Sequence, residues 1–321
     1  MRALKTVLFV VSLLFLVALV YWVGAGPILE TMRRLTWWQF VLVCLPYVVI
    51  MAVDTLGWRF AFARDHAPFW RLYGARVVGE ALNVVTAIGS VGGEAAKVWL
   101  LRRDVSYAES LPSIVIAKTT ITIAQALFLL IGIVLAWSAL DVDSQILSAM
   151  LWLLVIEVAA VAGFFLAQLS GLVARGGRLL QTFGVVSDVS SATQLDEALR
   201  SYYRHEWRRF TLSVAFHLGG WLLGAVEAFV MLWALDIDAD VVVATVIEAL
   251  GSGVRFATFL VPASLGAFEG ANAAAFGVLG FGAGAGLAFS LVRRARQVVW
   301  VVVGMGVLLA MRWATPQATR G

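Results

Sequence analysis

The sequence is poor in the residue types on which most enzymes and nucleic-acid-binding proteins depend. Its 321 residues include one cysteine and three histidines, and only 14% of them are charged. The lone Cys44 excludes a disulfide framework and a thiolate metal site, and the histidines lack metal-ligand spacing. No nucleophile elbow, Walker loop, zinc-binding helix or dinucleotide fingerprint is present. We therefore expect no metal, no cofactor and no nucleic-acid partner.

Apolar residues, in contrast, are abundant. They make up 61% of the chain, and the mean hydropathy of +0.90 is higher than the surface of a soluble domain of this length would tolerate. Six stretches are long and apolar enough to cross a bilayer. They are residues 4–23, 37–56, 113–139, 147–169, 210–234 and 287–311. We predict an all-α, polytopic membrane protein with one membrane domain over residues 1–321.

The basic residues near the ends of the chain predict its orientation. Arg2 and Lys5 precede the first apolar stretch, and Arg312 and Arg320 follow the last. Because basic residues are enriched on the cytoplasmic side, both termini are expected in the cytoplasm of a bacterial cell with the chain in its inner membrane.

The longest polar connection, residues 170–209, is also basic and is expected on the cytoplasmic side. Leu195, Leu199 and Tyr202 within it have helical spacing, which favours an amphipathic helix along the membrane surface. The connection either recruits anionic lipids or is a solvated segment that sets the orientation of the spans.

Two further segments, residues 72–101 and 241–282, are apolar but interrupted. The interruptions that we single out are Glu80, Asn83, Gly92, Gly93, Glu94 and Lys97 in the first, and Glu248, Arg255, Pro262, Gly266, Glu269 and Gly270 in the second. Charged side chains and irregular backbone at membrane depth are costly unless protein shields them or they line a wet cavity. We therefore predict two re-entrant segments, each a broken helix that enters and leaves the membrane by the same face.

The two interrupted segments share an order of features that indicates an internal repeat. Each contains Glu-Ala-Leu, then a glycine-containing break and a glutamate, although the two glutamates are 14 positions apart in one copy and 21 in the other. Lys118 lies 24 positions after Glu94, and Arg293 lies 24 positions after Glu269. Counting spans predicts inverted halves, residues 37–139 and 210–313, joined through the fourth span and residues 170–209. Inverted repeats with broken helices are typical of transporters, whose site lies between the copies.

The breaks have the composition of an anion site. The free N–H groups and the dipole of a half-helix favour a phosphate, and glycine lets a headgroup approach the backbone. The cations expected to neutralise it are Lys97, Lys118, Arg293, Arg294 and Arg296. We expect Glu94 to pair with Lys118 and Glu269 with Arg293, or one of these acids to couple to protons. As an alternative, the pairs only lock the re-entrant segments in place.

Three further acids, Asp54, Glu157 and Glu227, fall deep in predicted spans. They either line a polar pathway or join neighbouring helices by hydrogen bonds.

Several of these stretches are similar to a known family. They are Gly92-Gly93-Glu94-Ala-Ala-Lys97, His217-Leu-Gly-Gly, Glu248-Ala-Leu-Gly, Val261-Pro-Ala-Ser-Leu-Gly-Ala-Phe-Glu269-Gly270 and Ser290-Leu-Val-Arg-Arg-Ala-Arg296. Over nearly its whole length the chain resembles the flippase-like membrane domain of the lysylphosphatidylglycerol synthase family, and within it the stand-alone branch associated with hopanoid biosynthesis. Ala263-Ser264 stand where we expect a glycine nearby.

The resemblance implies a protein that moves a lipid between leaflets or is associated with lipid transport. Its partners are then membrane lipids: a hopanoid, a phospholipid or an isoprenoid-linked lipid. Aminoacylation is not expected, because the family's synthase activity belongs to a C-terminal soluble domain and this sequence ends at Gly321. A non-transporting scaffold that holds lipid-biosynthetic enzymes through residues 170–209 is the alternative. A membrane enzyme is the weakest hypothesis, since no catalytic constellation is recognisable.

Overall fold

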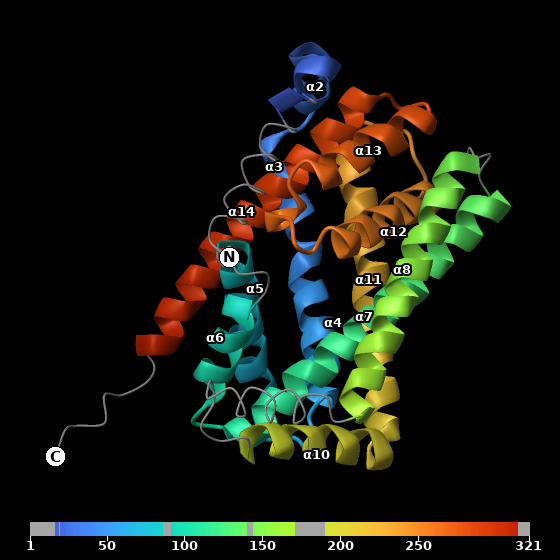
Figure 1. Cartoon of the computed structure of the whole chain (residues 1–321). Helices are drawn as coiled ribbons and strands as arrows, with labels where there is room; N and C mark the ends of the chain where they lie inside the picture. Colours follow the sequence, from blue (N-terminus) through green and yellow to red (C-terminus); the bar gives the residue numbers. More distant parts are fainter. Residues whose placement is uncertain (1–16, 19, 86–90, 140–143, 171–189, 314–321) are drawn as a thin grey trace.

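The computed structural model describes residues 17–18, 20–85, 91–139, 144–170 and 190–313 (Figure 1). All regular structure in these ranges is helical, which confirms the predicted all-α class. The helices are α2 (Ala25–Arg33), α3 (Trp37–Cys44), α4 (Pro46–Phe60), α5 (Phe69–Val85), α6 (Val91–Leu101), α7 (Tyr107–Ala139), α8 (Ser144–Ser170), α10 (Ser190–His205), α11 (Trp207–Ala234), α12 (Val241–Ala257), the 3₁₀ turn η1 (Pro262–Ser264), α13 (Ala267–Val278) and α14 (Ala283–Trp313).

Five helical stretches among the described residues are long and apolar enough to cross a membrane. They are Trp37–Phe60, Tyr107–Ala139, Gln145–Gln168, Trp207–Ala234 and Ala283–Arg312. These correspond to the predicted second to sixth spans. The predicted first span, residues 4–23, falls largely outside the described residues. The chain is thus a multi-pass membrane protein.

The first of these five stretches is two helices in sequence. Thr36 begins α3, and its backbone N–H donates to Gln39 Oε1 at 2.8 Å, which satisfies one of the free N–H groups of the helix start. The helix ends before Pro46, which has no N–H to continue the hydrogen-bond ladder but is well suited to the start of α4. The carbonyl of Cys44 instead accepts a hydrogen bond from Trp300 Nε1 of α14 at 3.2 Å. The break thereby ties α3 and α4 to α14.

Each interrupted segment forms two short helices. The first gives α5 and α6, which pack against each other, and the second gives α12 and α13, with α13 packed on α14. Figure 1 shows α5 and α6 in the lower half of the molecule, on the side of α10, and α12 and α13 in the upper half, on the side of α2. That the two halves are inverted stays a prediction. That each pair enters and leaves by one membrane face stays a prediction.

The break in the second segment is tight and strained. Ala263 and Ser264 have φ angles of 52° and 49°, and Gly266 has 78°. Such left-handed backbone is easy for glycine but costly for alanine and serine, so the expected glycine is missing where it would relieve strain. The helix α13 then begins with the N–H of Gly266 donating to Glu269 Oε2 at 2.7 Å.

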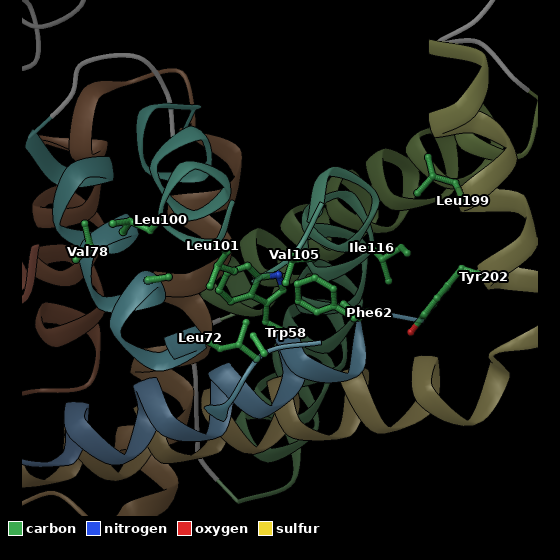
Figure 2. Close-up of a cluster of buried hydrophobic side chains, with 13 residues drawn as sticks. Trp58, Phe62, Leu72, Val78, Leu100, Leu101, Val105, Ile116, Leu199 and Tyr202 are labelled. Atoms are coloured by element: carbon green, nitrogen blue, oxygen red, sulfur yellow. The ribbon is translucent and has the colours of Figure 1, made fainter. Parts of the chain in front are cut away.

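The predicted amphipathic helix exists as α10, but its apolar residues do not face lipid. Leu199 and Tyr202 are buried in a hydrophobic cluster with Trp58, in the last turn of α4, and Phe62, which follows α4. Figure 2 shows Trp58 and Phe62 near the middle of this cluster, with Leu72 on one side and Tyr202 on the other. The Tyr202 hydroxyl donates to the carbonyl of Phe60 at 2.7 Å. The helix therefore packs on the protein, across the ends of the spans.

Helix α11 lies at the centre of the helix packing. It contacts α3, α4, α7, α10, α12 and α14. Its packing against α4 is close because Gly57 and Gly220 leave room for side chains of the opposite helix. A Cβ on Gly57 would lie 2.7 Å from the His217 ring, and one on Gly220 would lie 2.6 Å from Asp54 Oδ1. The two helices thus bring His217 and Asp54 together.

Candidate functional site

Two groups of buried charges lie inside the helical domain. The first charge cluster comprises Asp54, Arg76, Glu80, Glu94, Lys97, Lys118 and His217, from α4, α5, α6, α7 and α11. The second charge cluster comprises Glu227, Glu248, Arg255, Glu269, Arg293, Arg294 and Arg296, from α11, α12, α13 and α14. Each interrupted segment contributes to one of them, as the sequence pattern predicted.

Lys97 is the centre of the first charge cluster. Its side chain is only 4% exposed, and its Nζ lies 3.4 Å from Glu80 Oε1 and 3.2 Å from Glu94 Oε1. Lys118 Nζ approaches Glu94 Oε1 at 2.8 Å, so the predicted Glu94–Lys118 pair is present. Glu94 is thus shared between two lysines on different helices. This alternation of charge lets α5, α6 and α7 meet without an unpaired buried ion.

Behind these lysines lies a second row of charged groups. Asp54 Oδ2 accepts from Arg76 Nη2 at 3.0 Å, and Asp54 Oδ1 lies 3.0 Å from His217 Nδ1. His217 is completely buried, and Asp54 and Arg76 are nearly so. Sequence reasoning gave no role to His217 or Arg76. The available signal was a lone histidine in the small-residue run His217-Leu-Gly-Gly, in the middle of an apolar span.

A pocket opens onto this cluster. It holds about 310 Å³ of empty space, part of it open to the outside, and it is lined by Trp58, Arg76, Glu80, Glu94, Lys97, Ile114, Ala117, Lys118, Ile121 and His217. Trp58 forms its boundary with the hydrophobic cluster of Figure 2, where its Nε1 donates to Ser113 Oγ at 3.2 Å. Lys97 Nζ lies 5.8 Å from the centre of the Trp58 ring, a cation–π contact. The lining therefore combines five charged residues and His217 with four apolar residues.

The glycines of the first break serve helix packing. Gly93 is buried, its N–H donates to Asn83 Oδ1 at 2.9 Å, and an added Cβ would lie 2.0 Å from the Gly79 carbonyl. Gly79 in turn leaves room for the Lys97 stem, which an added Cβ would meet at 2.3 Å. The expectation that Gly93 lets a headgroup reach the backbone is therefore wrong, because α5 occupies that space. Gly92, next to it, is partly exposed.

In the second charge cluster the pairing differs from the expected one. Glu269 Oε1 accepts from Arg294 Nε at 2.8 Å, and Arg293 pairs with Glu248 at 2.5 Å. Arg255 Nη2 also reaches Glu248, at 2.8 Å. The predicted Glu269–Arg293 pair is wrong. Consecutive residues on a helix point about 100° apart, so Arg294 turns to α13 and Arg293 turns to α12.

Aromatic rings complete the second charge cluster. The Phe268 ring lies 5.0 Å from the guanidinium of Arg255, 5.7 Å from that of Arg293 and 5.9 Å from that of Arg294. Three guanidinium groups surround one ring. The cation–π contacts and the carboxylates described above offset the repulsion among these cations. Arginine suits this setting because its planar group can stack and pair at once.

Tyr47 of α4 lies beside the second charge cluster. The Arg296 guanidinium sits 4.3 Å from the Tyr47 ring and pairs with Glu227 at 3.4 Å. Tyr47 also packs against the buried apolar residues Ile50, Met51 and Val77. The break between α3 and α4 puts Tyr47 in this position, next to Trp300. Tyr47 thus joins α4 to the second charge cluster.

The remaining predicted residues lie beside the clusters or apart from them. Pro262 begins η1, and Gly270 lies in the first turn of α13, where its N–H donates to the Gly266 carbonyl at 2.7 Å. Glu157 of α8 is buried, and neither of its carboxylate oxygens has a hydrogen-bond partner within the part of the chain that the structure describes. Among the same residues, His, Cys, Asp and Glu form no group of three that could hold a metal ion.

These features define a class: a multi-pass helical membrane protein with charged groups buried in its interior. The model of the lysylphosphatidylglycerol synthase TM region matches residues 8–306. The chain therefore belongs to this family, and the resemblance inferred from its motifs is confirmed at that level. Membership connects it with membrane lipids and lipid-related processes. No curated protein and no solved structure matches the chain.

Proposed function

We propose that this protein moves a lipid between the two leaflets, with the headgroup passing the charged interior while the acyl chains stay in the bilayer. The observation that carries the proposal is that each interrupted segment contributes to a cluster of buried charges inside a multi-pass membrane domain. Burying so many ions in a membrane domain is costly, and intramembrane charges mark pathways for polar cargo. A broken helix on each side of a central site supports the same role.

The charges favour a cargo that carries a phosphate. Arg255, Arg293 and Arg294 converge on one ring, and Lys97 and Lys118 share one glutamate. Guanidinium and ammonium groups are the side chains that bind phosphate best. The resemblance to the hopanoid-associated branch makes a hopanoid a second candidate cargo. An uncharged hopanoid would leave these cations without a ligand, so we propose a phospholipid or an isoprenoid-linked phosphate first.

The protein would work in a bacterial inner membrane with both termini in the cytoplasm, as the basic residues predict. It would act by transport and not by catalysis. Cysteine labelling from each side of the membrane, at exposed positions of α10 and of the α11–α12 connection, would test the orientation. Labelling of both from the same side would contradict it.

Reconstitution into liposomes tests the proposal. Proteoliposomes would carry trace amounts of one headgroup-labelled lipid at a time: phosphatidylglycerol, phosphatidylethanolamine, an isoprenoid phosphate or a polar hopanoid. The label in the outer leaflet would be destroyed by an impermeant reductant. We expect protein-dependent loss of inner-leaflet label for at least one phosphate-bearing lipid, above that of empty liposomes. An unchanged leaflet distribution for every lipid would contradict lipid movement.

The scaffold alternative makes the opposite prediction for two parts of the chain. If the protein only holds lipid-biosynthetic enzymes, replacing the exposed polar residues of α10 abolishes its function, while the Glu248–Arg293 pair can be replaced freely. If it moves lipid, the Glu248–Arg293 pair is required and the α10 surface is not.

A further inference from the structure

His217 lines the pocket of the first charge cluster and, within the part of the chain that the structure describes, has one unpaired ring nitrogen. Its side chain is fully buried, its Nδ1 lies 3.0 Å from Asp54 Oδ1, and the residue lines the pocket. Its Nε2 is buried and has no hydrogen-bond partner among the described residues. Buried polar atoms are nearly always paired, so an unpaired one at a pocket indicates a missing ligand.

The partner on Nδ1 fixes the proton on the ring. An ionised carboxylate only accepts hydrogen bonds, so the hydrogen of a neutral His217 must sit on Nδ1, facing Asp54. Nε2 then carries a lone pair. A lone pair repels an anionic ligand, whereas a protonated Nε2 donates a hydrogen bond to it. Protonation therefore changes His217 from a group that repels an anionic ligand into one that donates a hydrogen bond to it.

The charges around the pocket are balanced before any ligand enters. With His217 neutral, the cluster holds three cations and three anions: Arg76, Lys97 and Lys118 against Asp54, Glu80 and Glu94. An incoming monoanion would leave this buried site with a net negative charge, which is costly in a low-dielectric interior. One proton on His217 restores the balance.

The charged groups around His217 come from the helices packed on α11 and from those that line the pocket. Asp54 of α4 contacts His217 directly, and the charged residues that line the pocket with it are Arg76 and Glu80 of α5, Glu94 and Lys97 of α6 and Lys118 of α7. Among the further neighbours of α11, Arg255 of α12 lies 6.0 Å from the Trp221 ring, about one turn along the helix from His217. Glu248 of α12 lies by Gly224, and Arg296 of α14 pairs with Glu227, both about two turns or more along the helix. Helix α3 carries no charged residue, and α10 meets α11 near Phe210, at its start.

We infer that this pocket binds a phosphate ester and that His217 takes up one proton when it does, donating a hydrogen bond to the phosphate through Nε2. The inference rests on the proposed function, because it names the chemistry and the proton linkage of the same interior. The proton comes from water and adds to Nε2, and no other bond forms or breaks. Arg76 Nε, also buried and without a hydrogen-bond partner among the described residues, is the second free donor.

Thermodynamic linkage makes the inference measurable. If binding takes up a proton, lowering the pH must strengthen binding, by up to about tenfold per pH unit above the ordinary histidine pKa of about 6.5. The number of protons follows from calorimetry of one binding reaction in two buffers with different ionisation enthalpies. The full chain in detergent would be titrated at about pH 7.5, one unit above that pKa.

Three probes separate the possible sources of the phosphate. They are dihexanoyl-phosphatidylglycerol, the phosphodiester glycerophosphoglycerol, and dihexanoylglycerol, which has the acyl chains but no phosphate. We expect the wild-type protein to bind the first with uptake of about one proton per ligand. His217→Asn keeps an N–H toward Asp54 but cannot titrate, and we expect weaker binding with no proton uptake. His205→Asn, an exposed histidine of α10, is the matched control and should behave as wild type.

Each result decides a different point. Binding of dihexanoyl-phosphatidylglycerol by wild type without proton uptake overturns the inference and leaves lipid movement untouched, and this result does not depend on any variant being folded. Equal binding of dihexanoylglycerol overturns the phosphate chemistry. Proton-linked binding of glycerophosphoglycerol alone supports the phosphate site but contradicts a lipid as its source. Proton uptake that persists in a folded His217→Asn protein assigns the proton elsewhere and overturns the role of His217.

Discussion

Lys97 of α6 and Lys118 of α7 share one carboxylate, that of Glu94, at 3.2 Å and 2.8 Å. Only Lys97 is buried, with its side chain 4% exposed against 42% for Lys118. Replacing Lys97 by methionine leaves Glu80 and Glu94 facing each other, and removal of one partner from a buried charge group costs about 3–5 kcal/mol. Lys118→Met should cost less than about 1 kcal/mol, because Glu94 keeps Lys97.

Thermal unfolding of the two variants in the same detergent measures this difference. A much larger fall in melting temperature for Lys97→Met than for Lys118→Met is the expected result. Equal shifts in melting temperature would show that the two lysines contribute equally to stability and that Lys97 is not the centre of the cluster.

Mutant cycles can distinguish the pairing of Glu269 with Arg294, seen in the structure, from the pairing of Glu269 with Arg293 that the sequence spacing predicted. A double-mutant cycle with Glu269→Gln and Arg294→Gln should give a coupling energy of about 1–3 kcal/mol, as residues in direct contact do. The same cycle with Glu269→Gln and Arg293→Gln should give less than about 0.5 kcal/mol. The measurement is thermal or denaturant unfolding of the four proteins of each cycle. Larger coupling to Arg293 would contradict the pairing seen here.

The strained turn before α13 predicts a stabilising substitution. Ala263 has a φ of 52°, a conformation that glycine adopts without the clash of a Cβ. Ala263→Gly should therefore raise the free energy of unfolding by about 0.5–1 kcal/mol. Ala274→Gly in the middle of α13 is the control and should lower it by about 1 kcal/mol, since glycine disfavours a helix. Destabilisation by both changes would show that the turn is not strained.

A charge network at the end of the spans gives the protein a pH dependence. Hydrogen bonds from Arg59 and Arg209, both at 2.7 Å, lower the pKa of Asp65 to about 2. Because the folded-state pKa lies below the unfolded one, Asp65 stabilises the fold above the unfolded pKa of about 3.9, and this contribution is lost as the pH falls toward 2.

Unfolding of wild type and Asp65→Asn measured between pH 7 and pH 2 tests this contribution. The variant should be slightly less stable at pH 7, by less than about 1 kcal/mol because the carboxylate is partly exposed, and the two proteins should converge in acid. A difference between them that stays constant over the whole range would contradict the assignment.

The sequence predicted the helices and the placement of the charges better than the contacts between them. Apolar length identified the spans, and the polar residues at 80–97 and 248–269 identified the two pairs of short helices, because membrane depth makes both patterns unusual. The Glu94–Lys118 pair followed from spacing. The Glu269–Arg293 pair did not, because spacing along a chain does not fix which of two neighbouring arginines turns toward a given helix.

The parts of the site that the sequence did not reveal depend on helices far apart in the chain. Asp54, Arg76 and His217 meet only because α4, α5 and α11 pack together, and Gly57 is what allows the His217 ring to fit against α4. Likewise, the sequence predicted that a headgroup could approach Gly93, but in the structure Gly93 packs against α5 at the contact between α5 and α6. Such pairings are long-range, and no local pattern encodes them.

The most direct test of the account is the rate of headgroup translocation in proteoliposomes when a buried charge pair is removed without leaving an unpaired ion. The double variant Glu269→Gln, Arg294→Gln does so in the second charge cluster, and Arg71→Gln, Asp104→Asn does so outside both clusters, near the start of α5 and after α6. For a phosphate-bearing lipid that wild type moves, the first variant should be slower by about tenfold or more, the loss of roughly one charge-assisted hydrogen bond, and the second should stay within about twofold of wild type. Equal rates for both folded variants and wild type would contradict a pathway through the charged interior.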